Sequence, residues 1–379
     1  MDMQDELKLT GTFADAKVFT TNINQETIHQ ITRLLNHPFS KGSKIRIMPD
    51  THIGKGAVVG TTMTYQDKMV PDVVGVDIGC GMYVAKLSKK KWKEADFKKL
   101  DQVINDEIPS GSGIRKKSHS LLKEINLDDV RALVRRRQRS ALAIGSLGGG
   151  NHFIELNKDE EENHYLVIHS GSRALGHDVA SYYQKKAVQQ WQERSNENEE
   201  GHFVDSEFAY LEDQDMEDYL HDVQICQQFA HLNRKAMMEE ITHKMDLEII
   251  STFDTVHNYV DVPNQIIRKG AISAQDGEEI IIPINMRDGS ILAVGKGNPD
   301  WNYSAPHGAG RLLSRTQAKK DLRMNDFKRA MQEVYTTSVR QNTLDEAPFA
   351  YKPMEEILSR TSEAFTVKSI LIPVYNFKA

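Results

Sequence analysis

Short runs of apolar and β-branched residues recur along the chain, bounded by turn-forming glycine, proline or aspartate. Runs of this length and composition predict β-strands, because β-branched side chains pack well on a pleated sheet. Several runs lead directly into a glycine-rich tip that carries Asp, Cys, His or Asn, and such tips place functional groups at the ends of rigid strands. The predicted strands cover residues 45–48, 73–76, 165–168, 280–284 and 369–374.

Longer segments place apolar residues three and four positions apart, which is the spacing of an amphipathic helix. Strands and helices follow one another in an irregular order, with no fixed-period repeat and no Pro/Ser-rich linker. We therefore expect an α+β fold in one compact domain over residues 1–379, with a mobile acidic surface excursion at about residues 193–218. The predicted helices cover residues 25–35, 127–143, 178–194, 216–244 and 325–335.

The composition, 39% hydrophobic and 27% charged residues, is typical of a soluble globular protein. No apolar run approaches the roughly 20 residues of a membrane-spanning helix, and the acidic N-terminal segment is unlike a signal peptide. We therefore expect a cytoplasmic protein without a membrane partner, by default a monomer. A net charge of −6 excludes a uniformly basic nucleic-acid coat. Basic clusters at residues 89–91, 131–139 and 315–323 are either solvated faces or parts of a basic groove.

Only two cysteines occur, Cys80 and Cys226, so a disulfide framework is excluded. Cys80 lies three residues after Asp77 on a glycine-interrupted turn, Val76-Asp-Ile-Gly-Cys-Gly81. A thiolate and a carboxylate at this spacing can converge on a divalent metal ion, and a thiolate sulfur can bridge two ions. The alternative is a buried structural cysteine at the end of a strand.

Three of the fourteen histidines occur in surroundings that suit metal or phosphate binding. His152 follows three glycines and Asn151, whose backbone and side-chain N–H groups suit a phosphate. His169 stands at the end of a predicted strand, four residues before Arg173, and an arginine binds phosphate with a bidentate fork. His257 lies in the motif His257-Asn-Tyr-Val. Each histidine taken alone is equally consistent with a structural role.

A further histidine, His307, lies in the motif Ser304-Ala-Pro-His-Gly-Ala-Gly-Arg311. The small residues after it permit close approach of a nucleotide, and Arg311 offsets phosphate charge. A neutral imidazole in this setting can attack phosphorus and form a phosphoramidate. The alternative is a tight turn before a helix that begins near Arg311. The sequence has no G-x-x-x-x-G-K-[ST] phosphate loop, no Lys-x-Asp-Gly and no G-x-S-x-G.

Taken together and in order, these motifs resemble the RtcB family of RNA ligases, and the resemblance covers essentially the whole chain. The ordered series is Met48-Pro-Asp-Thr-His-Ile-Gly-Lys-Gly56, Val74-Gly-Val-Asp-Ile-Gly-Cys-Gly81, Gly150-Asn-His-Phe153, His169-Ser-Gly-Ser-Arg173, Leu232-Asn-Arg234, His257-Asn-Tyr-Val260, Arg268-Lys-Gly-Ala271, His307-Gly-Ala-Gly-Arg311, Ala350-Tyr-Lys352 and the final Lys378.

The resemblance implies an enzyme that joins RNA ends bearing a 2′,3′-cyclic phosphate or 3′-phosphate to 5′-hydroxyl ends, using GTP and two Mn²⁺ ions, in RNA repair or tRNA splicing. Residue physics alone leaves the metal open, because a Cys, His and Asp set suits zinc at least as well. By resemblance His307 takes GMP from GTP. The implied metal ligands are Asp77, Cys80, His152, His169 and His257. The implied nucleotide contacts are Asn151, Phe153, Glu155, Asn258, Pro283, Asn285, Met286, Ser290, Gly308, Ala309, Gly310, Arg311, Tyr351 and Lys378.

The sequence departs from the family pattern at Pro283-Ile-Asn-Met-Arg-Asp288, where the family usually has Pro-Gly-Ser-Met-Gly. This difference puts the local ribose or phosphate contacts in doubt and indicates a divergent substrate. Two other functions remain open. One is a metal-dependent phosphohydrolase that opens cyclic phosphates without joining ends, and the other is an RNA-end-binding module without catalysis. An archease-type activator, which some family members require, is one candidate partner.

Overall fold

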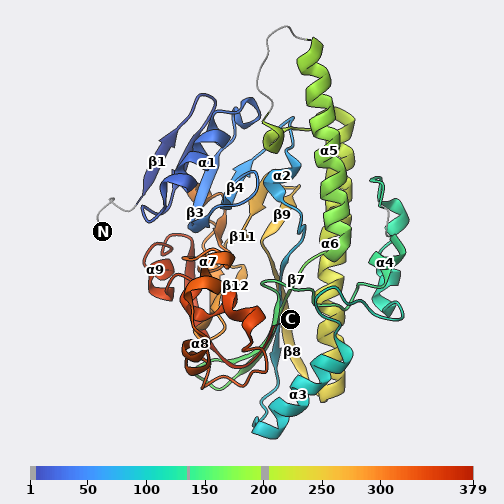
Figure 1. Ribbon diagram of the computed structural model, residues 1–379, viewed down its shortest axis with the longest axis vertical. Helices are drawn as coiled ribbons and strands as arrows, with labels where there is room; N and C mark the ends of the chain where they lie inside the picture. The colour runs from blue at the N-terminus through green and yellow to red at the C-terminus, as the bar shows by residue number, and fades with distance from the viewer. Residues whose placement is uncertain (1–5, 135–136, 198–204, 379) are drawn as a thin grey trace.

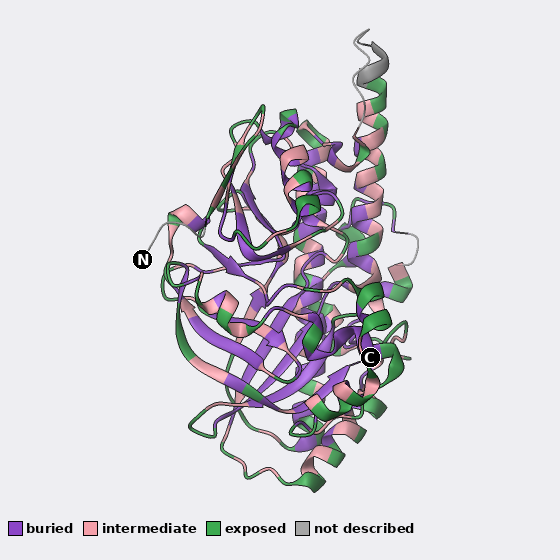
Figure 2. Cartoon of the chain, turned by 60° about the vertical axis from the view of Figure 1, so that its left-hand side comes forward, coloured by how far each residue is buried: buried purple, intermediate pink, exposed green. Residues whose placement is uncertain are grey.

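The computed structural model describes residues 6–134, 137–197 and 205–378. A seven-stranded, antiparallel sheet runs through the middle of the molecule, and its buried strands form the interior in Figure 2. Its strands, in spatial order, are β12 (Glu279–Asn285), β13 (Gly289–Gly295), β15 (Phe365–Lys378), β6 (Phe153–Lys158), β7 (His164–Ser170), β5 (Gly81–Leu87) and β8 (Ile249–Val256).

A six-stranded sheet forms the N-terminal side of the molecule, with only the β2–β3 pair parallel. A short β11–β14 ladder brings the segment before His307 next to Ala271, because Pro306 pairs with Ala271. The six strands in order are β1 (Leu7–Thr10), β2 (Asp15–Val18), β3 (Ile45–His52), β4 (Val59–Thr64), β10 (Ile266–Lys269) and β9 (Asn258–Asp261); the ladder strands are β11 (Ala271–Ser273) and β14 (Ser304–Pro306).

Two long helices, α5 and α6, run side by side along the molecule (Figure 1). The helix α1 shows how local sequence fixes an end, since the Asn24 side chain accepts a hydrogen bond from the Thr27 N–H. None of the described helices is long and apolar enough to cross a membrane. The helices are α1 (Gln25–Leu35), α2 (Pro71–Val74), α3 (Glu94–Glu107), α4 (Arg137–Ala141), α5 (Arg173–Glu197), α6 (Asp213–Met245), α7 (Arg315–Asp321), α8 (Met324–Ala330) and α9 (Met354–Leu358).

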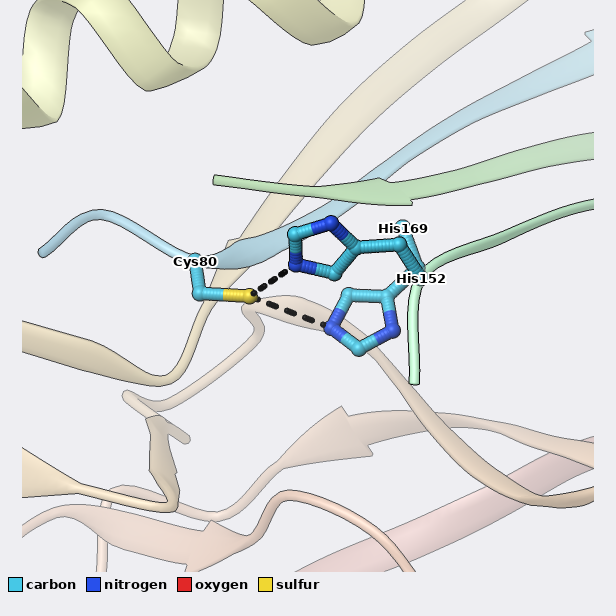
Figure 3. A group of neighbouring side chains, drawn as sticks. All are labelled: Cys80, His152 and His169. Carbon is cyan, nitrogen blue, oxygen red and sulfur yellow. Dashed lines mark hydrogen bonds between the residues drawn. The ribbon is translucent and has the colours of Figure 1, made fainter. Parts of the chain in front are cut away.

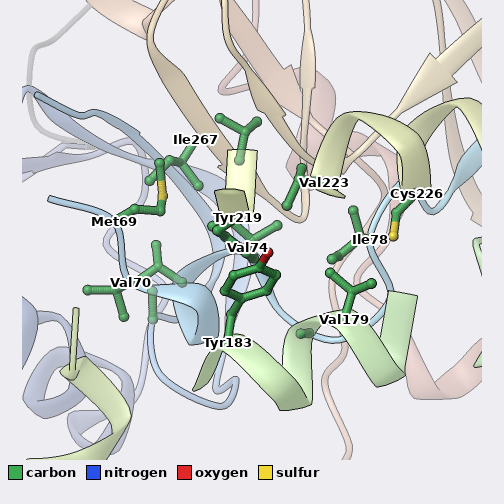
Figure 4. Close-up of a cluster of buried hydrophobic side chains, with 14 of the residues drawn as sticks. Met69, Val70, Val74, Ile78, Val179, Tyr183, Tyr219, Val223, Cys226 and Ile267 are labelled. Atoms are coloured by element: carbon green, nitrogen blue, oxygen red, sulfur yellow. The ribbon is translucent and has the colours of Figure 1, made fainter. Parts of the chain in front are cut away.

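The largest core cluster packs α5 and α6 against α2 and the N-terminal sheet. Figure 4 shows Tyr183 from α5 and Tyr219 from α6 at its centre, and their rings meet edge to face with centroids 5.1 Å apart. Cys226 lies in the same cluster, fully buried. This core fixes the segment between α2 and β5, which carries Asp77 and Cys80.

The α+β class predicted from the sequence is confirmed, but two predicted elements are wrong. Residues 73–76 form no strand. Pro71 at the first helical turn starts α2 instead, and Gly75, with φ of 93°, ends it. The helix predicted over residues 325–335 is shorter, because α8 ends at Ala330. In place of the helix predicted over residues 127–143, the described residues form the 3₁₀ turn η3 (Leu127–Asp129) and α4, while residues 135–136 lie outside the described residues. The cause is Asp222 on α6, whose carboxylate accepts from the backbone N–H groups of Arg131 and Ala132 at 2.9 and 2.7 Å.

The predicted acidic excursion at residues 193–218 begins at the end of α5. Residues 198–204 lie outside the described residues. From residue 205 onward the segment packs on the domain: Phe208 is fully buried, and Asp205 accepts two hydrogen bonds from the guanidinium of Arg33. Leu211 then pairs with Met69, and α6 begins at Asp213.

Candidate active site

Three side chains from three strand ends meet in one buried cluster. The Cys80 Sγ atom lies 3.3 Å from Nε2 of His169 and 3.5 Å from Nε2 of His152 (Figure 3). Cys80 directly precedes β5, His152 directly precedes β6, and His169 belongs to β7. These strands are neighbours in the seven-stranded sheet, so the sheet itself brings the three residues together. All three are buried.

His257 and Asp77 extend this cluster on either side. The Nε2 atom of His257 lies 3.3 Å from Nε2 of His169, and Oδ2 of Asp77 lies 3.1 Å from Nε2 of His152. His257 is held by its backbone, because its N–H donates to the Cys80 carbonyl at 2.9 Å. The five metal ligands predicted from the sequence are therefore brought to one place.

The hydrogen bonds of the rings determine which nitrogens are free. The Nδ1 atom of His152 lies 2.8 Å from the Leu147 carbonyl, and Nδ1 of His169 lies 3.2 Å from the Asn151 carbonyl. A carbonyl oxygen can only accept, so both Nδ1 atoms carry the proton and both Nε2 atoms present lone pairs to the cluster. The Nδ1 atom of His257 is buried without a partner among the described residues.

The electrostatics keep two of the rings, His169 and His257, neutral. Burial and the neighbouring His257 hold the pKa of His169 well below its usual value, and burial and His307 do the same to the pKa of His257. Burial, reinforced by Asp77, raises the pKa of the Cys80 thiol.

This donor set fits a metal ion. Two ligands at 2.0–2.3 Å from one tetrahedral ion lie about 3.3–3.5 Å apart, which matches the sulfur–nitrogen spacings of the cluster. The Nε2 lone pair of His152 faces the carboxylate of Asp77, so two acceptors meet in a buried site without a donor between them. A bound cation would satisfy both acceptors. The thiol must release its proton when a metal binds.

His307 lies beside this cluster. Its ring centroid is 5.0 Å from that of His257, and its Nδ1 atom lies 2.7 Å from Oδ2 of Asp50. The same carboxylate oxygen accepts from the Gly308 N–H at 3.2 Å. Gly310 is required next to it: a Cβ there would lie 2.3 Å from the Asp50 carbonyl oxygen, and its φ is +76°. With Nδ1 occupied, Nε2 is the ring nitrogen left for chemistry.

His307 also lines a cavity of about 220 Å³, together with His169 and His257 of the cluster. Of the nucleotide contacts predicted from the sequence, most line it. The predicted residues in its wall are Asn151, Phe153, Glu155, Pro283, Asn285, Met286, Gly308, Ala309, Gly310, Arg311, Tyr351 and Lys378, together with His169, His257 and His307.

Two predicted contacts are placed differently. Asn258 lines a neighbouring cavity of about 320 Å³ on the metal-cluster side, and its Oδ1 accepts from the Gly270 N–H at 2.9 Å. Ser290 is buried on β13, where it pairs with the cavity residue Pro283, and its hydroxyl has no partner among the described residues.

The far end of the cavity is built around the buried carboxylate of Glu346. Lys378 donates to it at 2.5 Å and the Tyr351 hydroxyl at 2.6 Å, while Arg315 lies 2.9 Å away. Burial opposes ionisation of Glu346, but the charges of Lys378 and Arg315 outweigh it and lower the pKa to about 2. Glu346 is therefore a permanent anion that holds these three groups in the cavity wall.

Glu155, the second buried carboxyl in this wall, behaves in the opposite way. Burial raises its pKa to about 7, although Asn376, which donates to it at 2.7 Å, and the nearby Lys378 both oppose the shift. It can therefore accept hydrogen bonds as a carboxylate near neutral pH and loses this capacity when protonated.

Three functional candidates were missed by the sequence reasoning. Asp50 and His52 stand at the end of β3, inside the motif Met48-Pro-Asp-Thr-His, and that placement at a strand end was the available signal. No comparable sequence signal pointed to Glu346, because it lies in the irregular 3₁₀ segment η6 (Gln341–Glu346).

The chain is similar to known proteins over nearly its whole length. A family model described as tRNA-splicing ligase RtcB matches residues 30–136 and 124–379. The RNA-splicing ligase RtcB of Escherichia coli K12 is 30% identical over 95% of this chain and 96% of its own length. The tRNA-splicing ligases RtcB of Nanoarchaeum equitans and Thermococcus kodakarensis are 26% and 25% identical, over 90% and 84% of this chain and 88% and 83% of their own lengths.

Proposed function

The chain belongs to the RtcB family, and we propose that it is a GTP- and Mn²⁺-dependent RNA ligase. Its proposed substrates are RNA ends with a 3′-phosphate or 2′,3′-cyclic phosphate and RNA ends with a 5′-hydroxyl, met in the cytoplasm. The observation that carries the proposal is the position of His307, which lies beside His257 of the Cys80 cluster and in the wall of the adjoining cavity.

The first proposed step is guanylylation of His307. Nε2 attacks the α-phosphorus of GTP, a P–N bond forms, and the P–O bond to pyrophosphate breaks. Asp50 supports this step in two ways: it fixes the ring so that Nε2 faces outward, and its charge stabilises the positive charge that the ring gains. Arg311, beside the cavity, offsets negative charge on the leaving phosphates.

The guanine would lie at the far end of the cavity. There Glu155 can accept hydrogen bonds from the N–H groups of the guanine edge, which adenine lacks, while Phe153 offers an aromatic face. Lys378 and Tyr351, held by Glu346, can contact the base or its carbonyl. We infer that this set of groups selects GTP.

The later steps exchange one phosphate bond at a time. Water opens a 2′,3′-cyclic phosphate by breaking the bond to the 2′-oxygen, which leaves a 3′-phosphate. An oxygen of that 3′-phosphate attacks the guanylate phosphorus, and the P–N bond to His307 breaks. The 5′-hydroxyl oxygen then attacks the RNA 3′-phosphate phosphorus, loses its proton, and displaces GMP.

Asp77, Cys80, His152, His169 and His257 would hold the two Mn²⁺ ions. When bound, such ions offset the negative charge of the phosphate oxygens and orient them for displacement. The protein's own part is to hold the imidazoles in place, which the Leu147 and Asn151 carbonyls support by fixing the Nδ1 protons of His152 and His169.

The proposal is tested by incubating the protein with Mn²⁺, GTP and two RNA oligonucleotides, one with a 3′-phosphate and one with a 5′-hydroxyl. We expect a joined product that requires both cofactors and is absent for His307→Ala. Opening of a cyclic phosphate without any joining would instead indicate a phosphohydrolase. Binding without either reaction would indicate an RNA-end-binding module.

A further inference from the structure

A second cavity, of about 540 Å³, lies at the far end of the strands that carry the catalytic cluster. Lysines dominate its wall: three follow β5 in sequence, and Lys158 ends β6. We call it the lysine cavity. It is lined by Lys89, Lys90, Lys91, Trp92, Phe97, Lys158, Glu162, His164 and Val374.

The strand β7 relates the two sites. His164 begins β7 and lines the lysine cavity, whereas His169, near the other end, belongs to the catalytic cluster. Five residue steps at about 3.3 Å separate them, which is roughly 17 Å. Because the step number is odd, the two side chains leave opposite faces of the sheet. An RNA strand that is bound at both sites must pass around the edge of the sheet. The lysine cavity would therefore hold the body of the RNA and not its reacting end.

The charges of this cavity are only partly compensated. Lys158 pairs with Glu162 at 2.7 Å, and Lys90 pairs with Asp96 at 3.1 Å. In the part of the chain that the structure describes, Lys89 and Lys91 have neither an ion pair nor a hydrogen bond, although the acidic turn before β7 is close. Within that turn Asp159 is already occupied, since it accepts from the Asn163 amide and the Tyr165 hydroxyl.

The neutral groups of the cavity also lack acceptors. The Trp92 Nε1 and the His164 Nδ1 atoms are both buried without a hydrogen-bond partner among the described residues, and His164 as a whole is only 6% exposed. An indole N–H can only donate. The rings of Trp92 and Phe97 stack in parallel, with centroids 5.8 Å apart and an interplanar angle of 8°. The cavity therefore combines an aromatic wall, where the Lys90 ammonium lies 4.7 Å from the Trp92 ring centroid, with unpaired cationic and neutral donors.

We propose that the lysine cavity binds a phosphate-bearing segment of single-stranded RNA. Phosphate oxygens would accept from Lys89, Lys91 and the Trp92 indole, and a base would pack on the aromatic wall, which is the combination that sequence-tolerant single-strand binding uses. This inference rests on the proposed function, because it takes the ligase's own RNA as the ligand. A free nucleotide offers the same chemistry, so the test separates the two.

The experiment uses the full chain and an RNA oligonucleotide with hydroxyl groups at both ends, which cannot react. Binding is followed by tryptophan fluorescence, and the signal is assigned to the cavity by its loss in Trp92→Phe. The charge variant is Lys89→Glu/Lys91→Glu. Its matched control, Lys41→Glu/Lys123→Glu, changes two exposed lysines outside the cavities described above.

We expect the charge variant to bind the RNA about tenfold more weakly than the control. The slope of log K against log salt should become less negative by about 1.4, the value for two lost single-strand phosphate contacts. Equal affinity in both variants would overturn the proposal, as would GMP binding to the cavity as tightly as the RNA. Guanylylation with GTP and Mn²⁺ in the absence of RNA should be unchanged in the charge variant. If the protein is guanylylated but its RNA affinity does not depend on Lys89 and Lys91, RNA binding at the lysine cavity is refuted and the proposed ligase activity is not.

Discussion

The Nδ1 atom of His307 lies 2.7 Å from Oδ2 of Asp50, a carboxylate that is fully buried and 257 positions away in the sequence. A buried carboxylate beside an imidazole sets which ring nitrogen carries the proton and how the ring is turned. The pair joins the N-terminal sheet, through β3, to the segment that follows β14. The proposed nucleophile is thus oriented by a strand that contributes none of the proposed metal ligands.

Replacing Asp50 with Asn tests this orientation. The amide can donate to Nδ1 and so favour the ring form whose Nε2 is protonated and cannot attack. We expect guanylylation of Asp50→Asn to be at least about 100-fold slower, by analogy with other histidine–aspartate pairs. The rate is measured with labelled GTP, with exposed Asp67→Asn as the control. A rate within a few-fold of the parent protein would show that the pair does not position His307.

The two cysteines provide a matched pair for the metal site. Cys80→Ser removes the sulfur that faces His152 and His169, so we expect Mn²⁺ bound per chain, measured by elemental analysis after gel filtration, to fall strongly. Cys226→Ala removes an equally buried thiol from the helical core and should leave the metal content unchanged. Equal metal content in both variants would mean that Cys80 is merely a core residue.

Glu155 predicts a pH-dependent preference for GTP. Burial raises its pKa to about 7, so its carboxylate form, the acceptor for guanine N–H groups, is lost as the pH falls from 8 to 6. The ratio of GTP to ATP affinity should fall over that range, and Glu155→Gln should lower it by about 10- to 100-fold at pH 8, as expected for loss of a charged hydrogen-bond acceptor. Calorimetric titrations measure both ratios. An unchanged ratio in Glu155→Gln, compared with exposed Glu160→Gln, would remove Glu155 from base recognition.

His37 predicts part of the acid sensitivity of the fold. Burial among aromatic rings lowers its pKa to about 4, so between pH 6.5 and 4 the unfolded chain binds a proton that the folded chain does not. The neutral His37 ring therefore contributes fully to the free energy of unfolding above pH 6.5. As the pH falls from 6.5 toward 4, protonation of the unfolded chain lowers that free energy by about 3 kcal/mol.

The measurement is denaturant unfolding at several pH values. His37→Asn keeps an acceptor for the Phe39 N–H but cannot titrate in this range, so its stability should fall less steeply with acid than that of the parent protein. Exposed His243→Asn is the control and should follow the parent. Parallel curves for the parent protein and His37→Asn would contradict the burial of a neutral imidazole at this position.

Local sequence predicted the parts of the site that depend on a strand and its tip. His169 at the end of β7 and Cys80 before β5 were identified because an apolar run or a glycine-rich turn stood next to them. That they converge follows from the order of strands in the sheet, which no local pattern contains. Only the ordered set of motifs indicated the resemblance to the RtcB family, which no single motif could indicate.

Other features depend on tertiary partners and could not be predicted. The run at residues 73–76 has strand composition, yet Pro71 and Gly75 make it the end of a short helix. The backbone N–H groups of Arg131 and Ala132 donate to Asp222 from α6, which removes them from helical pairing. Glu346 takes its place in the site from tertiary partners, among them Lys378, which contacts it from the last strand of the chain.

The central claim is that His307 carries guanylate next to a metal cluster. Mass spectrometry of the protein after incubation with GTP and Mn²⁺, followed by peptide mapping, tests it most directly. The account predicts one GMP per chain, acid-labile, on His307, and none when Mn²⁺ is withheld. A GMP adduct on another residue, or no adduct on a protein that joins RNA ends, would contradict it.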